Sequence, residues 1–152
     1  MTSFYTEQEL ATFGFKHYGT NVLISRKCSI YSPERISIGD NVRIDDFCIL
    51  SGEITLGSYI HISTYCALYG ALGIEMEDYT GLSPRCTVFS ATDDFSGNYL
   101  ISPMAEKHKT NVTGEKVLIK RYSQIGANCV ILPNITIKTG VATGAMSLIN
   151  KS

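Results

Sequence analysis

The sequence contains no run of roughly 18 consecutive apolar residues, the length that crosses a lipid bilayer as a helix. Its N-terminal segment, MTSFYTEQEL, also lacks the basic region and apolar stretch of a secretory signal. These two absences predict a soluble, cytoplasmic protein without a membrane partner. The chain has 152 residues, 44% of them hydrophobic, which suffices for one core and leaves little room for a second. We therefore expect a single domain spanning residues 1–152.

An excess of positive charge and a metal-binding cysteine pattern are also missing. The 13 Lys and Arg residues are interspersed with 14 Asp and Glu residues, and the formal net charge is -1. Without a basic stripe to neutralise phosphates, nucleic acid is not an expected partner. Five cysteines without any C-x-x-C pair disfavour a disulfide framework and a zinc cage. No metal requirement is predicted.

The sequence does contain a six-residue repeat of aliphatic side chains. This period fits neither an α-helix nor a plain alternating strand, and it indicates a short-period solenoid. The repeat shifts by two residues after Leu68 and is interrupted after Val88. Its positions are Ile24, Ile30, Ile38, Ile44, Leu50, Leu56, Ile62, Leu68, Met76, Leu82, Val88, Ile119, Ile125, Ile131, Ile137, Thr143 and Ile149.

A second row of small or β-branched residues lies four positions after the first and should also face inward. Three hexapeptides form one triangular coil, and stacked coils pair their backbones as parallel strands do, at about 4.8 Å. The prediction is a mainly β fold, a parallel β-helix of about five coils. The second row comprises Val42, Cys48, Ile60, Cys66, Thr80, Cys86, Ser123, Cys129, Val141 and Ser147. Phrases that mark one corner of successive coils begin at Ile36, Ile54, Ile74 and Ile135.

All five cysteines occupy this small inward position, in the second hexapeptide of a coil. Stacked thiols can approach disulfide distance. In a reducing cytoplasm, buried thiols that serve as small hydrophobic side chains are the favoured interpretation, and no cysteine nucleophile is proposed. The row is Cys28, Cys48, Cys66, Cys86 and Cys129, continued by Ser147.

Two segments fall outside the repeat. Residues 6–13, TEQELATF, begin with a capping box of Thr6 and Glu9 and precede Gly14, which predicts a short helix that covers the first coil. Residues from about 91 to 115 form a long loop that leaves the β-helix. A solid prism has no internal pocket, so a site requires a projecting element and a neighbouring subunit. The loop is therefore the expected active-site loop.

The repeat, and above all the segment IGANCVILPNITIKTGVATGAMSLINKS at residues 125–152, resembles the hexapeptide-repeat acyltransferases. The galactoside, maltose and surface-sugar acetyltransferase branch is the most similar. The resemblance covers residues 21–152 and implies a left-handed parallel β-helix, a homotrimer, and acetyl-CoA as co-substrate in the groove between neighbouring subunits. It also implies that the family chain continues beyond Lys151, so that part of the adenosine site is expected outside this sequence.

Matching positions imply which residues bind the donor. Gly126, Ala127, Gly144 and Ala145 would line the arm of coenzyme A through backbone groups, and Lys151 would meet a CoA phosphate. Tight Gly-Ala corners do bring backbone amides close to an extended ligand, and a lysine supplies a point charge for phosphate. Turn geometry alone also explains small residues at such corners.

The expected catalytic residues are His61, Asp93 and Asp94. Related sugar acetyltransferases carry a histidine base in the loop after the hexapeptide that matches residues 82–87, and Asp93 occupies the matching position here. His61 precedes the inward Ile62 and should therefore point outward, although an isolated outward histidine is often only a surface residue. Asp93 and Asp94 can orient an acceptor or accept a proton, but DDFSG can equally be a simple turn.

These observations predict an acetyl-CoA-dependent acetyltransferase that acts on an amino or nucleotide-linked sugar of cell-surface polysaccharide synthesis. An aspartate accepts a proton from an attacking amine more readily than from a hydroxyl, which slightly favours N-acetylation. Two alternatives remain open. One is a non-catalytic β-helix scaffold. The other is a zinc enzyme like the β-helical carbonic anhydrases, for which the three histidines, His17, His61 and His108, offer no close pair.

Overall fold

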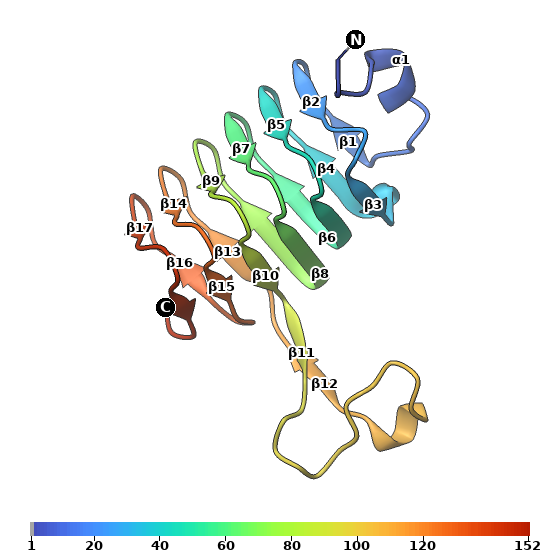
Figure 1. The fold of residues 1–152 in the computed structure, drawn as a ribbon, viewed down its shortest axis with the longest axis vertical. Helices are drawn as coiled ribbons and strands as arrows, with labels where there is room; N and C mark the ends of the chain where they lie inside the picture. The colour runs from blue at the N-terminus through green and yellow to red at the C-terminus, as the bar shows by residue number, and fades with distance from the viewer. Residues whose placement is uncertain (1) are drawn as a thin grey trace.

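The computed structural model describes residues 2–152, and its dominant feature is a column of stacked β-coils (Figure 1). The N- and C-termini lie at opposite ends of the column, and one long loop projects from its side. Every strand pair within the column is parallel. The predicted mainly β solenoid with one extruded loop is confirmed.

One face of the column is a six-stranded sheet in which each coil places one short strand. In sheet order the strands are β2 (Val22–Ile24), β5 (Val42–Ile44), β7 (Ile60–Ile62), β9 (Gly81–Leu82), β14 (Gln124–Ile125) and β17 (Ala142–Thr143). The register places the repeat positions above one another, with Ile44 opposite Ile62 and Ile62 opposite Leu82. Since each strand of this sheet belongs to a different coil, the column has slightly more coils than the five expected.

The remaining faces form one ten-stranded sheet. Its strands are β1 (His17–Tyr18), β3 (Ser29–Tyr31), β4 (Ile36–Ile38), β6 (Ile49–Leu56), β8 (Ala67–Met76), β10 (Thr87–Phe89), β13 (Val117–Ile119), β15 (Val130–Ile131), β16 (Thr136–Ile137) and β18 (Leu148–Ile149). β8 contains two more residues than β6 between its paired positions, because Gly52 pairs with Gly70 but Ile54 pairs with Ile74. This β-bulge is the physical origin of the two-residue shift after Leu68.

The inward positions of the repeat form the core. All of the predicted repeat positions are buried except three, which are half-buried. Ile30 lies near the N-terminal end of the column, and Thr143 and Ile149 lie in its last coil. In the second row, the buried members run from Val42 to Cys129, whereas Val141 is 36% exposed. Val141 belongs to the last coil and has no further coil to cover it. The corner positions Ile36, Ile54 and Ile74 pair with one another as predicted.

A single helical turn closes the N-terminal end. α1 (Glu7–Leu10) begins with the predicted capping box, in which the Thr6 side chain accepts a hydrogen bond from the Glu9 N–H and the Glu9 carboxylate accepts one from the Thr6 N–H. The helix was expected to reach residue 13 but ends at Leu10. The Thr12 hydroxyl donates to the Glu9 carbonyl, and Phe13 turns away to pack against Tyr5.

The long loop leaves the column between β10 and β13 as an antiparallel ribbon (Figure 1). β11 (Ala91–Asp93) pairs with β12 (Val112–Gly114), with Asp93 opposite Val112. At the tip, the 3₁₀ turn η2 (Lys107–Lys109) carries three basic residues. A second 3₁₀ turn, η1 (Pro33–Arg35), lies in the column itself. The boundaries predicted for the loop therefore coincide with the two strands that form its stem.

The thiols form a regular row along the core. Each Sγ atom donates a hydrogen bond to a main-chain carbonyl of the next coil, for example Cys48 to Ser63 at 3.0 Å and Cys66 to Ser83 at 3.2 Å. Cys48, Cys66, Cys86 and Cys129 are buried, Cys28 is half-buried, and all five are free thiols.

Native protein should consequently react slowly with a thiol reagent, because the reactive species is an accessible thiolate. The expected time course has one faster thiol, Cys28, and four that react only as the column opens. A parallel reaction in denaturant should label all five at once. Rapid labelling of all five thiols in the native protein would contradict the inward placement of the row.

Candidate functional site

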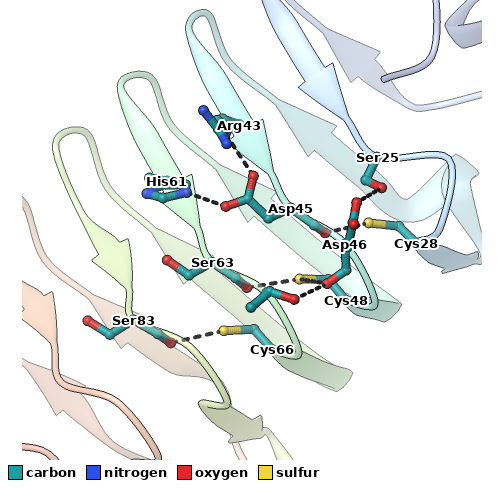
Figure 2. A network of polar contacts seen from close by, with 11 residues as sticks. Ser25, Cys28, Arg43, Asp45, Asp46, Cys48, His61, Ser63, Cys66 and Ser83 are labelled. Carbon is teal, nitrogen blue, oxygen red and sulfur yellow. Dashed lines mark hydrogen bonds and ion pairs between the residues drawn. The ribbon is translucent and has the colours of Figure 1, made fainter. Parts of the chain in front are cut away.

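His61 lies at the edge of a polar cluster that is centred on Asp45, on the outer surface of the six-stranded sheet (Figure 2). It is on β7, between the inward residues Ile60 and Ile62, so its ring points outward as the sequence predicts, and its side chain is 53% exposed. Its Nε2 atom lies 2.7 Å from the Asp45 carboxylate. The Arg43 Nε atom also donates to Asp45, at 2.7 Å. Asp45 thus fixes the orientation of the imidazole.

The charge of Asp45 is maintained by these two partners. Partial burial opposes ionisation of the carboxyl, but the hydrogen bonds from Arg43 and His61 lower the pKa of Asp45 below its ordinary value. Asp45 is therefore an anion at neutral pH. A carboxylate beside one ring nitrogen leaves the other nitrogen, Nδ1, available to a ligand. Sequence reasoning identified His61 but did not identify Asp45 as the residue that holds it.

A pocket of about 400 Å³ lies next to this cluster and is lined by Asp45, Asp46 and the N-terminal residues Ser3 and Phe4, together with Arg43 and Thr64. Several of its polar groups already have protein partners. The Ser25 hydroxyl donates to the Asp46 side chain, and the Thr64 hydroxyl donates to the Asp46 carbonyl. Figure 2 shows these bonds tying the first coils together, which is a structural role.

The two loop aspartates have different surroundings. The Asp94 carboxylate accepts hydrogen bonds from the Ser96 N–H and from the Asn111 side-chain amide, both at 2.8 Å. Hydrogen bonding by the Ser96 side chain, then by the Ser96 N–H and the Asn111 amide, lowers the pKa of Asp94. The bond from Ser96 makes this segment the Asx turn that the sequence allowed. Asp93 is half-buried at the end of β11 and lines a pocket. Asp94 therefore stabilises the loop through its hydrogen bonds, whereas Asp93 lines a pocket in which a ligand can contact it.

That pocket lies where the loop meets the column and encloses about 800 Å³, within the range of small-molecule sites. Asp93 and Tyr69 contribute from the stem of the loop and the column, and Ser102, Lys107 and Thr110 contribute from the distal part of the loop. Tyr69 stacks on Phe89 of the next coil, with ring centroids 5.4 Å apart. The pocket therefore combines an aromatic ring, hydroxyl groups, an anion and a cation.

The predicted donor-site residues lie on the C-terminal corners. Gly126 donates its N–H to the Thr143 hydroxyl at 3.0 Å, and a Cβ atom there would lie 2.6 Å from the Thr143 carbonyl oxygen. Coil stacking alone thus requires a glycine at this position. At Gly144 a Cβ would meet nothing within 4 Å, and Ala145 and Lys151 are exposed. Ala127 is half-buried and accepts a hydrogen bond from the Met146 N–H.

Within one chain, the predicted catalytic residues do not form one cluster. No hydrogen bond or ion pair joins His61 to Asp93 or Asp94 among residues 2–152. Over the same residues, no three His, Cys, Asp or Glu side chains are grouped as metal ligands, and no helix is long and apolar enough to cross a membrane.

Comparison with known proteins decides the family. The chain is 38% identical over 148 residues to a dTDP-4-amino-4,6-dideoxy-D-glucose acyltransferase of Escherichia coli, covering 95% of this chain and 77% of the relative. The chain belongs to the hexapeptide-repeat acyltransferases. It is an acyl-CoA-dependent enzyme, which confirms the transferase prediction and removes the non-catalytic scaffold. No model of a protein family matches the sequence.

Solved structures of AntD, an N-acyltransferase from Bacillus cereus, have the same fold. A complex with dTDP and coenzyme A matches with a TM-score of 0.98 and 54% identity, over 100% of this chain and 82% of AntD. A complex with dTDP and 3-hydroxybutyryl-CoA matches with a TM-score of 0.97. Several of these crystals contain variants of a serine or of an aspartate ten positions further along the AntD chain.

In the acyltransferase described here, Ser83 and Asp93 are the one serine and aspartate pair with that order and spacing. Ser83 was not among the residues selected from the sequence. It follows the inward Leu82 and is half-buried, and its carbonyl oxygen accepts the Cys66 thiol. A serine at a solenoid corner is typical of the repeat itself, so no sequence signal set it apart.

The two corner glycines of this enzyme provide a matched stability test. Gly126→Ala should lower the free energy of unfolding by about 1–3 kcal/mol, because the added methyl overlaps the Thr143 carbonyl. Gly144→Ala should leave it nearly unchanged, since the added methyl meets open space. Thermal or denaturant unfolding of both variants measures the difference. Equal stabilities would show that the Gly126 corner relaxes without cost.

Proposed function

We propose that this acyltransferase transfers an acyl group, acetyl in the simplest case, from acyl-CoA to the amino group of a dTDP-linked 4-amino-4,6-dideoxy sugar in the cytoplasm. The observation that carries this proposal is the 54% identity over the whole chain to AntD, which binds dTDP-4-amino-4,6-dideoxyglucose and coenzyme A in one complex. The E. coli relative bears the name of an acyltransferase for the same sugar.

The chemistry requires an oriented amine beside a thioester. The nitrogen attacks the carbonyl carbon, the carbon–sulfur bond breaks, and coenzyme A leaves as a thiol while the nitrogen loses a proton. Asp93 is suited to hold the amine, because its carboxylate faces a pocket and has no hydrogen-bond partner or ion pair among residues 2–152. The spacing match to the variant positions of AntD supports Asp93 and adds Ser83 to the same site.

His61 is the second candidate base. Asp45 holds its imidazole through Nε2, and Nδ1 has no hydrogen-bond partner among residues 2–152, which suits an oriented general base. The donor would lie along the C-terminal corners, on the backbone of Gly126, Ala127, Gly144 and Ala145. In this arrangement Lys151 meets a CoA phosphate.

A homotrimer is part of the proposal. The projecting loop exposes large apolar side chains that a single chain leaves uncovered, including Met104 at 91% and Phe95 at 74% exposure. The set comprises Phe95, Tyr99, Leu100, Ile101, Met104 and Val112. Large apolar side chains exposed together on one loop are typical of an interaction site. A neighbouring copy that covers the loop would also bring its own outer sheet, with His61, toward this loop.

The activity is tested directly with purified protein, acetyl-CoA and dTDP-4-amino-4,6-dideoxyglucose. Coenzyme A release should depend on the amino sugar, and mass spectrometry should find the acyl group on its nitrogen. A dTDP-linked sugar with a hydroxyl group at C4 is the matched control, because it offers an oxygen where the amino sugar offers a nitrogen. Turnover of the hydroxy sugar but not of the amine would contradict N-acylation.

Variants separate the candidate residues. Asp93→Asn should reduce turnover by roughly two to four powers of ten, and His61→Asn should do so if the imidazole is the base. Asp94→Asn, which keeps the length of the side chain in the loop turn, should have a smaller effect. Steady-state kinetics with both substrates measure these changes.

Mixing the Asp93→Asn and His61→Asn proteins tests whether neighbouring chains share one site. If both variants are inactive and the site is shared, mixed trimers contain some intact interfaces and recover activity. Trimers whose mixed composition is verified by mass should be assayed. Absence of recovery in them would place both residues in one chain's site or remove one from the site.

A further inference from the structure

The pocket beneath the loop carries one charge of each sign. Asp93 lies at the end of the loop stem, where it pairs with Val112 across the ribbon, and Lys107 lies in the distal turn of the loop. Both line the same space of about 800 Å³. A ligand that fills it therefore meets an anion at one point and a cation at another.

Lys107 and Lys109 occupy the same short turn but serve different surfaces. The Lys109 ammonium is bound to the Glu106 carboxylate at 2.9 Å, and Lys109 lines a separate pocket with Asn98 and Tyr99. Lys107 has no ion-pair partner within residues 2–152, and it lines the pocket that contains Asp93. Its main chain is fixed, because Thr110 donates both its N–H and its hydroxyl to the Lys107 carbonyl.

We propose that Lys107 binds the diphosphate of the nucleotide sugar and is a specificity-determining residue of this acyltransferase. The inference rests on the proposed function, and it extends it to a residue outside the predicted donor and acceptor sets. A nucleotide amino sugar carries an amine and a diphosphate on opposite sides of one sugar ring, so its charges match Asp93 and Lys107 in sign. An ammonium on a fixed turn supplies the point charge that a diphosphate requires.

Coenzyme A also contains a diphosphate, so the source of the phosphate has to be chosen. The presence of Asp93 in the same pocket favours the acceptor, because the sugar amine is basic and can pair with a carboxylate as an ammonium, whereas the adenine amino group of coenzyme A stays uncharged. Tyr69 adds an aromatic surface to the same pocket, which suits a pyrimidine base or a sugar ring. The donor positions lie elsewhere, on the corners that contain Gly126 and Gly144.

The experiment compares Lys107→Ala with Lys109→Ala in the full chain. Affinities for dTDP and for coenzyme A are measured by calorimetry, and KM for the dTDP amino sugar is measured by kinetics. Lys107→Ala should weaken dTDP binding and raise KM by about tenfold to a hundredfold, and it should leave coenzyme A affinity unchanged. Lys109→Ala should match the wild type. Lys107→Arg, which keeps the charge, should recover most of the dTDP affinity.

Three results would overturn the inference, and they differ from failure of the proposed function. Wild-type dTDP affinity in Lys107→Ala would remove the residue from the site. Loss of coenzyme A affinity alone would assign Lys107 to the donor. Equal losses in Lys107→Ala and Lys107→Arg would indicate a disturbed loop rather than a missing charge. A wild-type protein that binds no dTDP would instead contradict the proposed function, and with it this inference.

Discussion

Backbone pairing between successive coils is the constraint on which the rest of this structure depends. Each coil is too small to bury its own apolar residues, and its backbone N–H and C=O groups have no partners within the coil. Stacking meets both requirements, because the coils on either side cover the side chains and bond to the backbone. The Ile49 N–H bound to the Cys66 carbonyl at 2.9 Å is one rung of this ladder. Side chains at equal positions then stack, which aligns the aliphatic rows and the thiols.

A column built in this way has a solid interior, so ligands can bind only on its outer surface. Outward side chains such as His61 stand on flat strands, where a neighbour such as Asp45 fixes their orientation but cannot enclose a substrate. The loop overcomes this limit, because its ribbon carries Asp93, its distal turn carries Lys107, and both line a pocket with Tyr69 of the column. The loop also exposes large apolar side chains, including Phe95 and Met104, and the proposed trimer depends on this surface.

The two glycine corners differ in what coil stacking requires of them. At Gly126 the contact with Thr143 already excludes a side chain, so its small size has a structural cause whatever binds there. At Gly144 no such contact exists, and an open corner beside exposed backbone is available to an extended ligand. Residue type alone made these two positions look equivalent. Their surroundings separate them.

The sequence by itself determined the solenoid, its inward residues, the capping box and the ends of the loop, because these follow from local spacing and one repeated backbone geometry. Tertiary structure decided the rest. The helix ends at Leu10, and Phe13 beyond it packs on Tyr5 in a contact outside the repeat. Asp93 and Asp94 differ in their surroundings, as do Lys107 and Lys109, because the folded loop brings different partners near each residue. Two residues of the same type at nearby sequence positions cannot be distinguished in this way from the sequence alone.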